Sequence, residues 1–420
     1  MVSSSDNLNP FNKRVIYWLS IALIAFIALS FMTPWKALPR LFLFVGVTLS
    51  LVILLFYNYK DLIKKDKLVS AACSIVLYVA LSNFLHNIEL KEVLQSLRWS
   101  ATTIIFIIAV ALSSFYWATR PRIFSRLFIS IVLIVSILTM VIHFWQGYYS
   151  ARMSGVGFMG HPILGPSALM CLWAAGLVLM SKVKPLSVFD YCLVSFSFLS
   201  LFSLTFMSQS RGPLISLIIY TIIMLFVMVL HLDLRKRSFV KIVASVVFFL
   251  VVIFGMLSPL VDNMLERGTS YRLDIFQATI ENPPESFFFG TGSAASFEDS
   301  PAGKVLREET NVRIEHPHNL FLSVYYSSGI FALLCLFSII ITLIARIINN
   351  SESNAFISSG LALLFLAIML NTTDGSKIVA PPSADWMFFW FPFAFLCGVF
   401  YSGHDGGARL SPTNQRDSIQ

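Results

Sequence analysis

Two histidines stand directly in front of a long apolar run in the stretch EHPHNLFLSVYYSSG, residues 315–329. Pro317 favours extended backbone for the residue before it, so the imidazoles of His316 and His318 are expected to face the same side. A neutral imidazole near pH 7 is suited to removing a proton from a hydroxyl group. The pair therefore predicts a general base at the start of an apolar helix.

The same two histidines could instead bind a metal ion, with Glu308, Glu309 or Glu315 as a further ligand. The sequence contains no His-Glu-x-x-His motif and no third ligand at helical spacing. It also contains no Asp-x-Asp pair that could hold Mg²⁺ against a diphosphate. We therefore expect a reaction that needs no metal and no other cofactor.

Two arginines lie where apolar runs are interrupted. Arg211 is in MSQSRGPL, and the Gly-Pro pair that follows it is typical of a break between helices. Arg272 is early in the amphipathic segment TSYRLDIF. A guanidinium group offers a fixed fork of donors that matches phosphate oxygens, so both residues are candidates for anion binding. Alternatively, Arg211 reaches to the membrane surface, and Arg272 forms a surface ion pair with Asp274 or Glu266.

The elements that position these side chains are membrane helices. Hydrophobic residues make up 57% of the 420 residues and charged residues only 12%, whereas a soluble domain carries about 25% charged residues. All five cysteines lie in apolar runs, which favours buried thiols over a disulfide or metal framework. A spanning helix needs roughly 20 apolar residues. We predict an all-α polytopic membrane protein with about twelve spans, at residues 15–32, 41–58, 68–85, 101–118, 127–147, 163–180, 186–207, 213–232, 239–257, 318–345, 355–371 and 385–403.

Basic residues collect on one set of connections between these spans, which holds 18 of the 30 Lys and Arg residues. The positive-inside rule then places this set, and both termini, in the cytoplasm. The net charge of +8 is thus a signal of topology, and we expect no nucleic acid among the partners. The predicted organisation is helices 1–9 over residues 1–257, one large external loop with short helices over 258–317, helices 10–12 over 318–403, and a disordered cytoplasmic tail over 404–420.

Together these features describe a reaction on the outer face of a membrane. Arginines can hold a diphosphate and stabilise it as it leaves, and a histidine can activate an acceptor hydroxyl. Membrane helices can hold the hydrocarbon tails of lipid substrates. We therefore predict glycosyl transfer from a lipid-diphosphate sugar. A transporter or flippase is the alternative, but the predicted mid-span regions contain no Asp, Glu, Lys or Arg that would line its pathway.

The order of the motifs SQSR, YRLDIF, NPPESFFFGTG and His-Asn-x9-Gly, with one large loop before a late span, resembles the O-antigen ligase and polymerase superfamily. The resemblance covers roughly residues 140–390. The spacing from His318–Asn319 to Gly329 is similar to the ligase signature, and a single large loop also favours a ligase over a polymerase. Oligosaccharyltransferases that modify pilin use similar motifs and are a further alternative.

The resemblance implies an activity and a location. It implies inverting, metal-independent transfer of a polysaccharide from undecaprenyl diphosphate to lipid A–core during lipopolysaccharide biosynthesis. The partners would be the lipid-linked glycan donor, the lipid A–core acceptor and membrane lipid. The protein would be a multi-pass protein of the bacterial inner membrane, with its active site facing the periplasm and both termini in the cytoplasm.

The resemblance also implies roles for particular residues. His318 would be the catalytic base, and Arg211 and Arg272 would bind the diphosphate. Five further residues are substrate-binding candidates: Arg152, Asp374, His316, His161 and Asn319. Arg152, in RMSG, and Asp374 resemble positions of the family, whereas the resemblance gives no role to His316 or His161. Asn319 either orients His318 or caps the helix that it begins.

Overall fold

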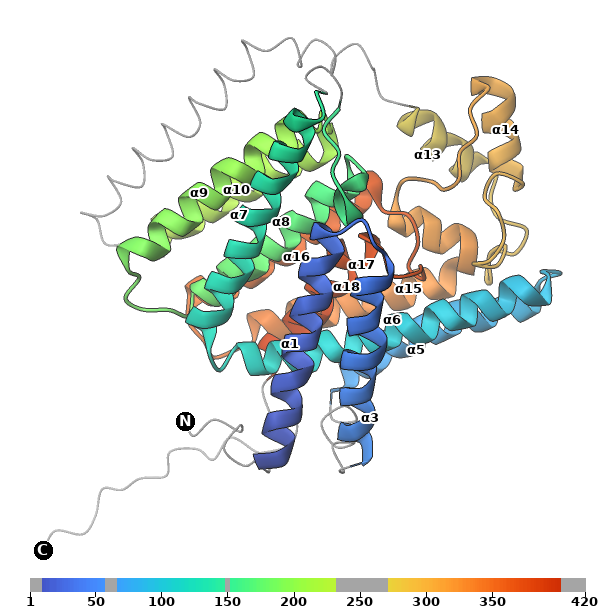
Figure 1. Ribbon diagram of the computed structural model, residues 1–420. Helices are drawn as coiled ribbons and strands as arrows, with labels where there is room; N and C mark the ends of the chain where they lie inside the picture. The colour runs from blue at the N-terminus through green and yellow to red at the C-terminus, as the bar shows by residue number, and fades with distance from the viewer. Residues whose placement is uncertain (1–9, 57–65, 148–151, 232–270, 402–420) are drawn as a thin grey trace, which may run out of the picture.

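The computed structural model describes residues 10–56, 66–147, 152–231 and 271–401, and throughout these ranges the regular structure is helical. The described helices pack side by side in one bundle (Figure 1). Eight segments are long and apolar enough to cross a membrane. The prediction of a helical multi-pass membrane protein is therefore confirmed.

The eight long segments follow the apolar runs of the sequence. They are α1 (Pro10–Met32), the segment Ala37–Phe56 that ends in α3 (Thr48–Phe56), the segment Lys67–Leu85 that begins with α5 (Lys67–Leu81), α6 (Leu90–Trp117), α7 (Pro121–Trp145), α9 (Val188–Met207), α15 (Leu320–Ile348) and α16 (Asn354–Asp374). Shorter apolar helices are α8 (Leu164–Met180), α10 (Arg211–His231) and α18 (Trp390–Val399).

Eleven of the twelve predicted spans overlap with these helices, eight of them with segments long enough to cross a membrane, and the span 239–257 lies outside the described residues. Two predicted bounds need correction. α6 begins at Leu90, eleven residues before the predicted start, because the amphipathic stretch LKEVLQSLRW continues the helix. The span 385–403 is not one helix: it is divided at Phe389 into α17 (Asp385–Phe388) and α18.

The core of the bundle lies around α18, all of whose residues are buried. Gly398 allows α18 to approach α6 closely, because a Cβ atom there would lie 2.1 Å from the carbonyl oxygen of Ala111. Small residues serve the same purpose in other membrane bundles. Trp117 of α6 packs edge-on against Phe128 of α7 at a centroid distance of 4.9 Å, which continues this core outward.

Several connections between helices are rich in Lys and Arg, and the parts of them that the structure describes lie together at one end of the bundle. Three ion pairs join them in the described structure: Asp66–Arg346 at 2.8 Å, Arg126–Asp190 at 2.7 Å and Lys182–Glu352 at 2.9 Å. Each pair joins residues that are distant in sequence, from the starts or ends of neighbouring helices. Successive helices therefore alternate in direction, as expected for a chain that crosses a membrane repeatedly.

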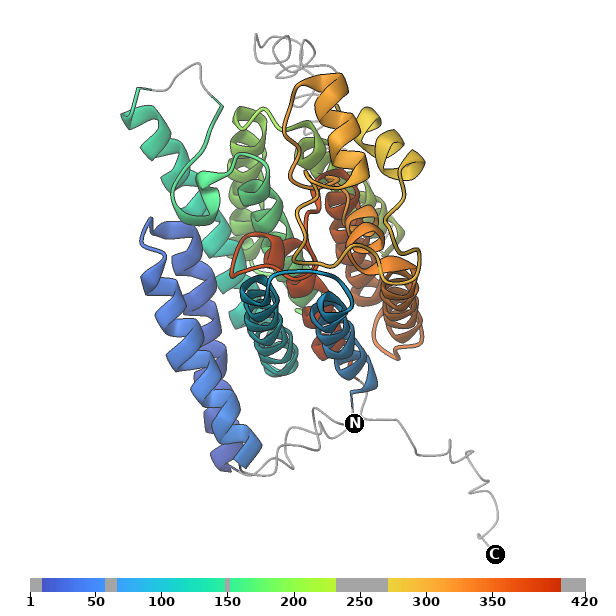
Figure 2. The same cartoon turned by 90° about the vertical axis from the view of Figure 1, so that its right-hand side faces the viewer.

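A small cap lies at the opposite end, beyond the start of α15 (Figures 1 and 2). It contains α13 (Arg272–Glu281) and α14 (Pro301–Thr310) and has its own apolar core, which includes Ile275, Leu306 and Tyr326 of α15. Short helices are thus observed in the described part of the predicted large loop. The earlier part of that loop and the predicted tail over 404–420 lie outside the described residues.

The cap is attached to α15 through a kink in that helix. Gly329 has φ 77° and ψ −178°, which interrupts the helical backbone. The backbone of residues 287–292 lies against this kink: Ile330 N–H donates to the Phe287 carbonyl at 3.0 Å, and Gly292 N–H donates to the Ser327 carbonyl at 2.9 Å. Two of the sequence motifs, NPPESFFFGTG and His-Asn-x9-Gly, therefore meet in one backbone contact.

Candidate active site

Four helices begin around the C-terminal end of α16, at Asp374. Arg211 and Arg272 are the first residues of α10 and α13, Asn319 is the N-cap of α15, and His161 shortly precedes α8. The first N–H groups of a helix lack partners within the helix and carry partial positive charge. The convergence of helix starts and arginines makes this region suited to binding an anion such as a phosphate group.

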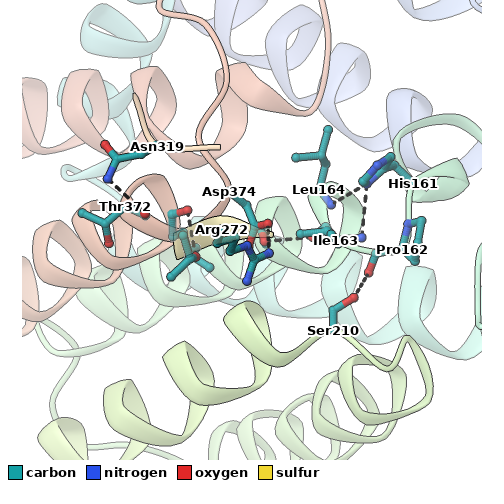
Figure 3. A network of polar contacts seen from close by, with 12 residues as sticks. His161, Pro162, Ile163, Leu164, Ser210, Arg272, Asn319, Thr372 and Asp374 are labelled. Atoms are coloured by element: carbon teal, nitrogen blue, oxygen red, sulfur yellow. Dashed lines mark hydrogen bonds and ion pairs between the residues drawn. The ribbon is translucent and has the colours of Figure 1, made fainter. Parts of the chain in front are cut away.

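The side chains of Arg272 and Asp374 form an ion pair in which Arg272 Nη2 donates to Asp374 Oδ1 (Figure 3). The Asp374 side chain is 4% exposed and that of Arg272 is 27% exposed. Asp374 Oδ2 faces Gly212 at the start of α10, where an added Cβ would lie 2.6 Å away. The predicted alternative of a pair with Asp274 is wrong, and Glu266 lies outside the described residues.

Arg152 holds the break between α9 and α10 in place. Its Nε donates to the Ser208 carbonyl at 3.1 Å, and its Nη2 donates to Ser210 Oγ at 3.0 Å. Ser210 Oγ in turn donates to the Pro162 carbonyl at 2.8 Å, as Figure 3 shows. The break predicted from SQSRGP is confirmed, since α9 ends at Met207 and α10 begins at Arg211. These contacts fix the start of α10 against the segment before α8.

His161 caps the start of α8 through one of its ring nitrogens. Its Nδ1 accepts from the N–H groups of Ile163 at 3.3 Å and Leu164 at 3.2 Å (Figure 3). An Nδ1 that accepts hydrogen bonds carries no proton, so the proton of the neutral ring is on Nε2. Burial, and then the charge of Arg152, lowers the pKa of His161. His161 is therefore a neutral donor at neutral pH.

His316 and His318 lie with their rings 4.3 Å apart, measured between centroids, at an angle of 48°. Burial lowers the pKa of each to about 4, and neighbouring positive charge contributes: Lys377 for His316, and His316 and Arg272 for His318. Both imidazoles are thus neutral at pH 7 and offer a lone pair. The pair is in the form that a general base requires.

Asn319 joins the start of α15 to the end of α16. Its Oδ1 accepts from the N–H groups of Phe321 at 2.9 Å and Leu322 at 3.1 Å, which is an N-cap. Its Nδ2 donates to the carbonyl of Thr372 at 3.2 Å (Figure 3). Of the two interpretations of Asn319, the helix cap is the one observed. The same contacts fix the backbone directly after His318.

Three residues with a left-handed backbone lie at or just before the candidate residues. They are Gln209 with φ 50°, Tyr271 with φ 60° and His318 with φ 52°. Such a conformation costs a non-glycine residue about 1–2 kcal/mol and is found preferentially at functional sites. The extended chain predicted around Pro317 therefore does not continue through His318, although the two imidazoles do lie together.

The described structure brings all eight candidate residues to one end of the bundle: Arg152, His161, Arg211, Arg272, His316, His318, Asn319 and Asp374. One neighbour, Lys377, was not predicted, although it lies only three residues after Asp374 in the same connection. Within the described ranges, no three His, Cys, Asp or Glu residues are grouped as metal ligands would be.

The sequence comparisons agree with this arrangement. Residues 196–337 match the sequence model of a protein family described as O-antigen ligase. The matched region contains Arg211, Arg272 and both His316 and His318. The family comprises enzymes of the O-antigen ligase and polymerase type, and the match therefore supports an enzyme of this glycosyltransferase-like class. No curated protein matches the chain. The motifs, the convergent site and this match agree, and over residues 196–337 the chain is similar to the O-antigen ligase family.

Proposed function

We propose that this protein is an O-antigen ligase, which transfers a polysaccharide from undecaprenyl diphosphate to a sugar of lipid A–core. One observation carries the proposal: a half-buried, neutral histidine pair lies next to Arg272, where several helices begin. A base that is neutral at pH 7 beside an anion site is the combination that hydroxyl attack on a glycosyl diphosphate requires.

In the proposed reaction His318 takes the proton of the acceptor hydroxyl. The hydroxyl oxygen attacks the anomeric carbon of the donor, and the bond from that carbon to the diphosphate oxygen breaks. The electron pair of this bond leaves with undecaprenyl diphosphate, so the anomeric configuration is inverted. The chain supplies each function with its own residues and needs no metal for this sequence of steps.

Arg211 and Arg272 would bind the diphosphate and stabilise the negative charge that develops as it leaves. Both stand at the first position of a helix, where backbone N–H groups add to their charge. Asp374 holds Arg272 in position before the donor arrives. Arg152 would act mainly through the break before α10, which it fixes by two hydrogen bonds.

The proposed location is the bacterial inner membrane, with the site on the periplasmic side and both termini in the cytoplasm. The distribution of Lys and Arg supports this orientation, because the described connections of the basic set lie at the end of the bundle away from the histidine pair. The proposed donor is a lipid-linked glycan, the proposed acceptor is lipid A–core, and both would reach the site from the membrane.

The first experiment reconstitutes the purified protein in liposomes with undecaprenyl-diphosphate-linked glycan, with and without lipid A–core, and separates the products on a gel. Glycan attached to lipid A–core supports the ligase. Lengthened lipid-linked glycan that forms without this acceptor would refute it in favour of a polymerase.

A pair of variants tests the proposed base. His318→Ala and His318→Asn are both expected to abolish transfer while the protein remains in the membrane. Asn tolerates the left-handed backbone found at this position, so its variant removes the imidazole with little additional strain. Wild-type transfer by His318→Asn would remove His318 from the mechanism.

A further inference from the structure

A shallow hollow lies beside His316, and it has a volume of about 500 Å³ when the open solvent at its mouth is included. Its walls come from the loop after α13, the first turns of α15 and the connection after α16. None of the candidate arginines lines it, and neither does Asp374. It is therefore a space distinct from the arginine side of the site, and it shares only the histidine region with that side.

Three polar side chains that line this pocket have charges or hydrogen-bonding groups that no ion pair or hydrogen bond satisfies in the described structure. Glu315 and Lys377 are exposed, and neither forms an ion pair with another described residue. Ser323 is 7% exposed, and its hydroxyl is buried without a hydrogen-bond partner among the described residues. A buried hydroxyl without a partner is unfavourable unless a ligand or water completes it.

Other hydroxyls of the same wall are already engaged. Thr291 Oγ1 donates to the carbonyl of Tyr326 at 3.2 Å, and Ser376 Oγ donates to Asp385 at 2.7 Å. These residues shape the wall and do not compete for a ligand. Glu315, Lys377 and Ser323 are therefore the groups able to select what enters, with aromatic surface from Phe297 beside them.

These groups match a saccharide. A carboxylate accepts hydrogen bonds from sugar hydroxyls, an ammonium group donates to them, and a serine hydroxyl does either. A diphosphate is a poor fit, because the wall offers one lysine and no arginine, and Glu315 would repel it.

The histidine pair connects this pocket to the arginines. Lys377 is close enough to His316 for its charge to act on that imidazole, and Arg272 acts in the same way on His318. The two rings are 4.3 Å apart. An inverting displacement needs the attacking hydroxyl and the leaving diphosphate on opposite sides of the reacting carbon. A saccharide in the pocket and a diphosphate at the arginines would satisfy this requirement.

We propose that the pocket lined by Glu315, Ser323 and Lys377 binds the acceptor saccharide and presents its hydroxyl to the histidine pair. This inference rests on the proposed function, because it assigns the acceptor side of the same site. Glu315 and Lys377 would hold hydroxyls of the acceptor sugar, and Ser323 would complete its hydrogen bonds from the wall of α15.

The test measures binding and turnover separately. Water-soluble core oligosaccharide, freed of its lipid, is titrated into the wild-type protein in detergent by calorimetry. Glu315→Gln and Lys377→Ala are each expected to weaken this binding about tenfold or more, the usual effect of losing a hydrogen bond to a charged group. In the liposome assay they are expected to raise the KM for lipid A–core while the KM for the donor stays at its wild-type value.

Glu309→Gln and Lys304→Ala are the matched controls, since both residues are exposed on α14 and lie outside the pocket. They are expected to bind core oligosaccharide as the wild type does. Unchanged binding in Glu315→Gln and Lys377→Ala, or a change in the donor KM alone, would overturn the acceptor pocket and leave the ligase proposal intact. A wild-type protein that transfers nothing to lipid A–core would instead refute the proposed function.

Discussion

Gly329→Ala tests whether the kink in α15 positions the catalytic region. The φ of 77° with ψ −178° is a conformation that L-residues adopt at a cost of about 1–3 kcal/mol. An added Cβ would also lie 2.0 Å from the Phe288 carbonyl oxygen, so the loop at residues 287–292 must move away. Three backbone hydrogen bonds join this loop to α15, and each contributes about 1 kcal/mol. The loss of all three hydrogen bonds, added to the backbone strain, would lower the free energy of unfolding by about 4–6 kcal/mol. This is comparable with the stability of a whole domain.

Gly147→Ala is the matched control for this substitution. Gly147 has a φ of 74°, but nothing lies within 4 Å of the position that its Cβ would occupy. The Gly147→Ala variant therefore has the backbone strain, about 1–2 kcal/mol, but its Cβ atom collides with no neighbouring atom. The loss of stability in Gly329→Ala is expected to be about threefold larger than in Gly147→Ala.

Buried thiols provide the assay. Cys171 and Cys397 are fully buried, so in a variant whose other cysteines are serine a thiol-reactive dye reports unfolding as the temperature rises. Gly329→Ala is expected to label at a markedly lower temperature than Gly147→Ala and to lose transfer activity. Equal labelling temperatures in the two variants, with wild-type transfer by Gly329→Ala, would refute the argument that this kink holds the site together.

Transfer is expected to have its acidic midpoint near pH 4 and to reach a plateau about two pH units above that midpoint, because burial lowers the pKa of His318 to about 4 and only the neutral imidazole accepts a proton. A midpoint near the usual 6.5, in a rate–pH profile whose activity recovers on return to pH 7, would contradict this. Arg272→Lys is expected to reduce turnover about tenfold or more, since one ammonium group cannot hold Asp374 and also offer two donors to a phosphate. Single-turnover rates measure this effect, and rates equal to the wild type would show that Arg272 does not bind the diphosphate. Arg211→Lys is expected to lose much of its activity for the same reason, and full activity would reduce Arg211 to an anchor at the membrane boundary. Turnover is expected to persist in EDTA, whereas a loss that added divalent metal restores would revive a metal site at His316 and His318.

Local patterns were sufficient to predict much of the fold. Apolar runs of the right length located the helices, because a lipid environment leaves few alternatives for a backbone that must satisfy its own hydrogen bonds. The Gly-Pro pair after Arg211 located the break before α10, and the type and position of Asn319 predicted a cap that is observed. Each of these inferences depends only on residues within a few positions of one another.

Inferences that depended on distant residues were less successful. Asp374 lies 102 residues from Arg272, whereas the sequence offers Asp274 as a partner only two residues away. Nothing in the sequence around Pro317 predicts the left-handed backbone of His318. These features depend on how α13, α15 and α16 meet, and that is decided by packing across the whole bundle. The neutral state of His318 follows from the same packing, because burial is its main cause.

The site is built largely from backbone at the starts of helices and in the breaks between them. Buried polar groups of such irregular backbone must be satisfied by protein or by water. Here protein side chains do so: Arg152 donates to the carbonyl of Ser208, His161 accepts from the start of α8, and Asn319 accepts from the start of α15 while donating to the end of α16. The candidate residues are thus of two kinds. Arg152, His161 and Asn319 are occupied in holding loops, whereas His316 and His318 lie between those loops with lone pairs available. Substitutions in the first kind should disturb the geometry and stability of the site together. Substitutions of the base should abolish transfer without changing the stability of the fold. This difference separates a positioning role from a catalytic one.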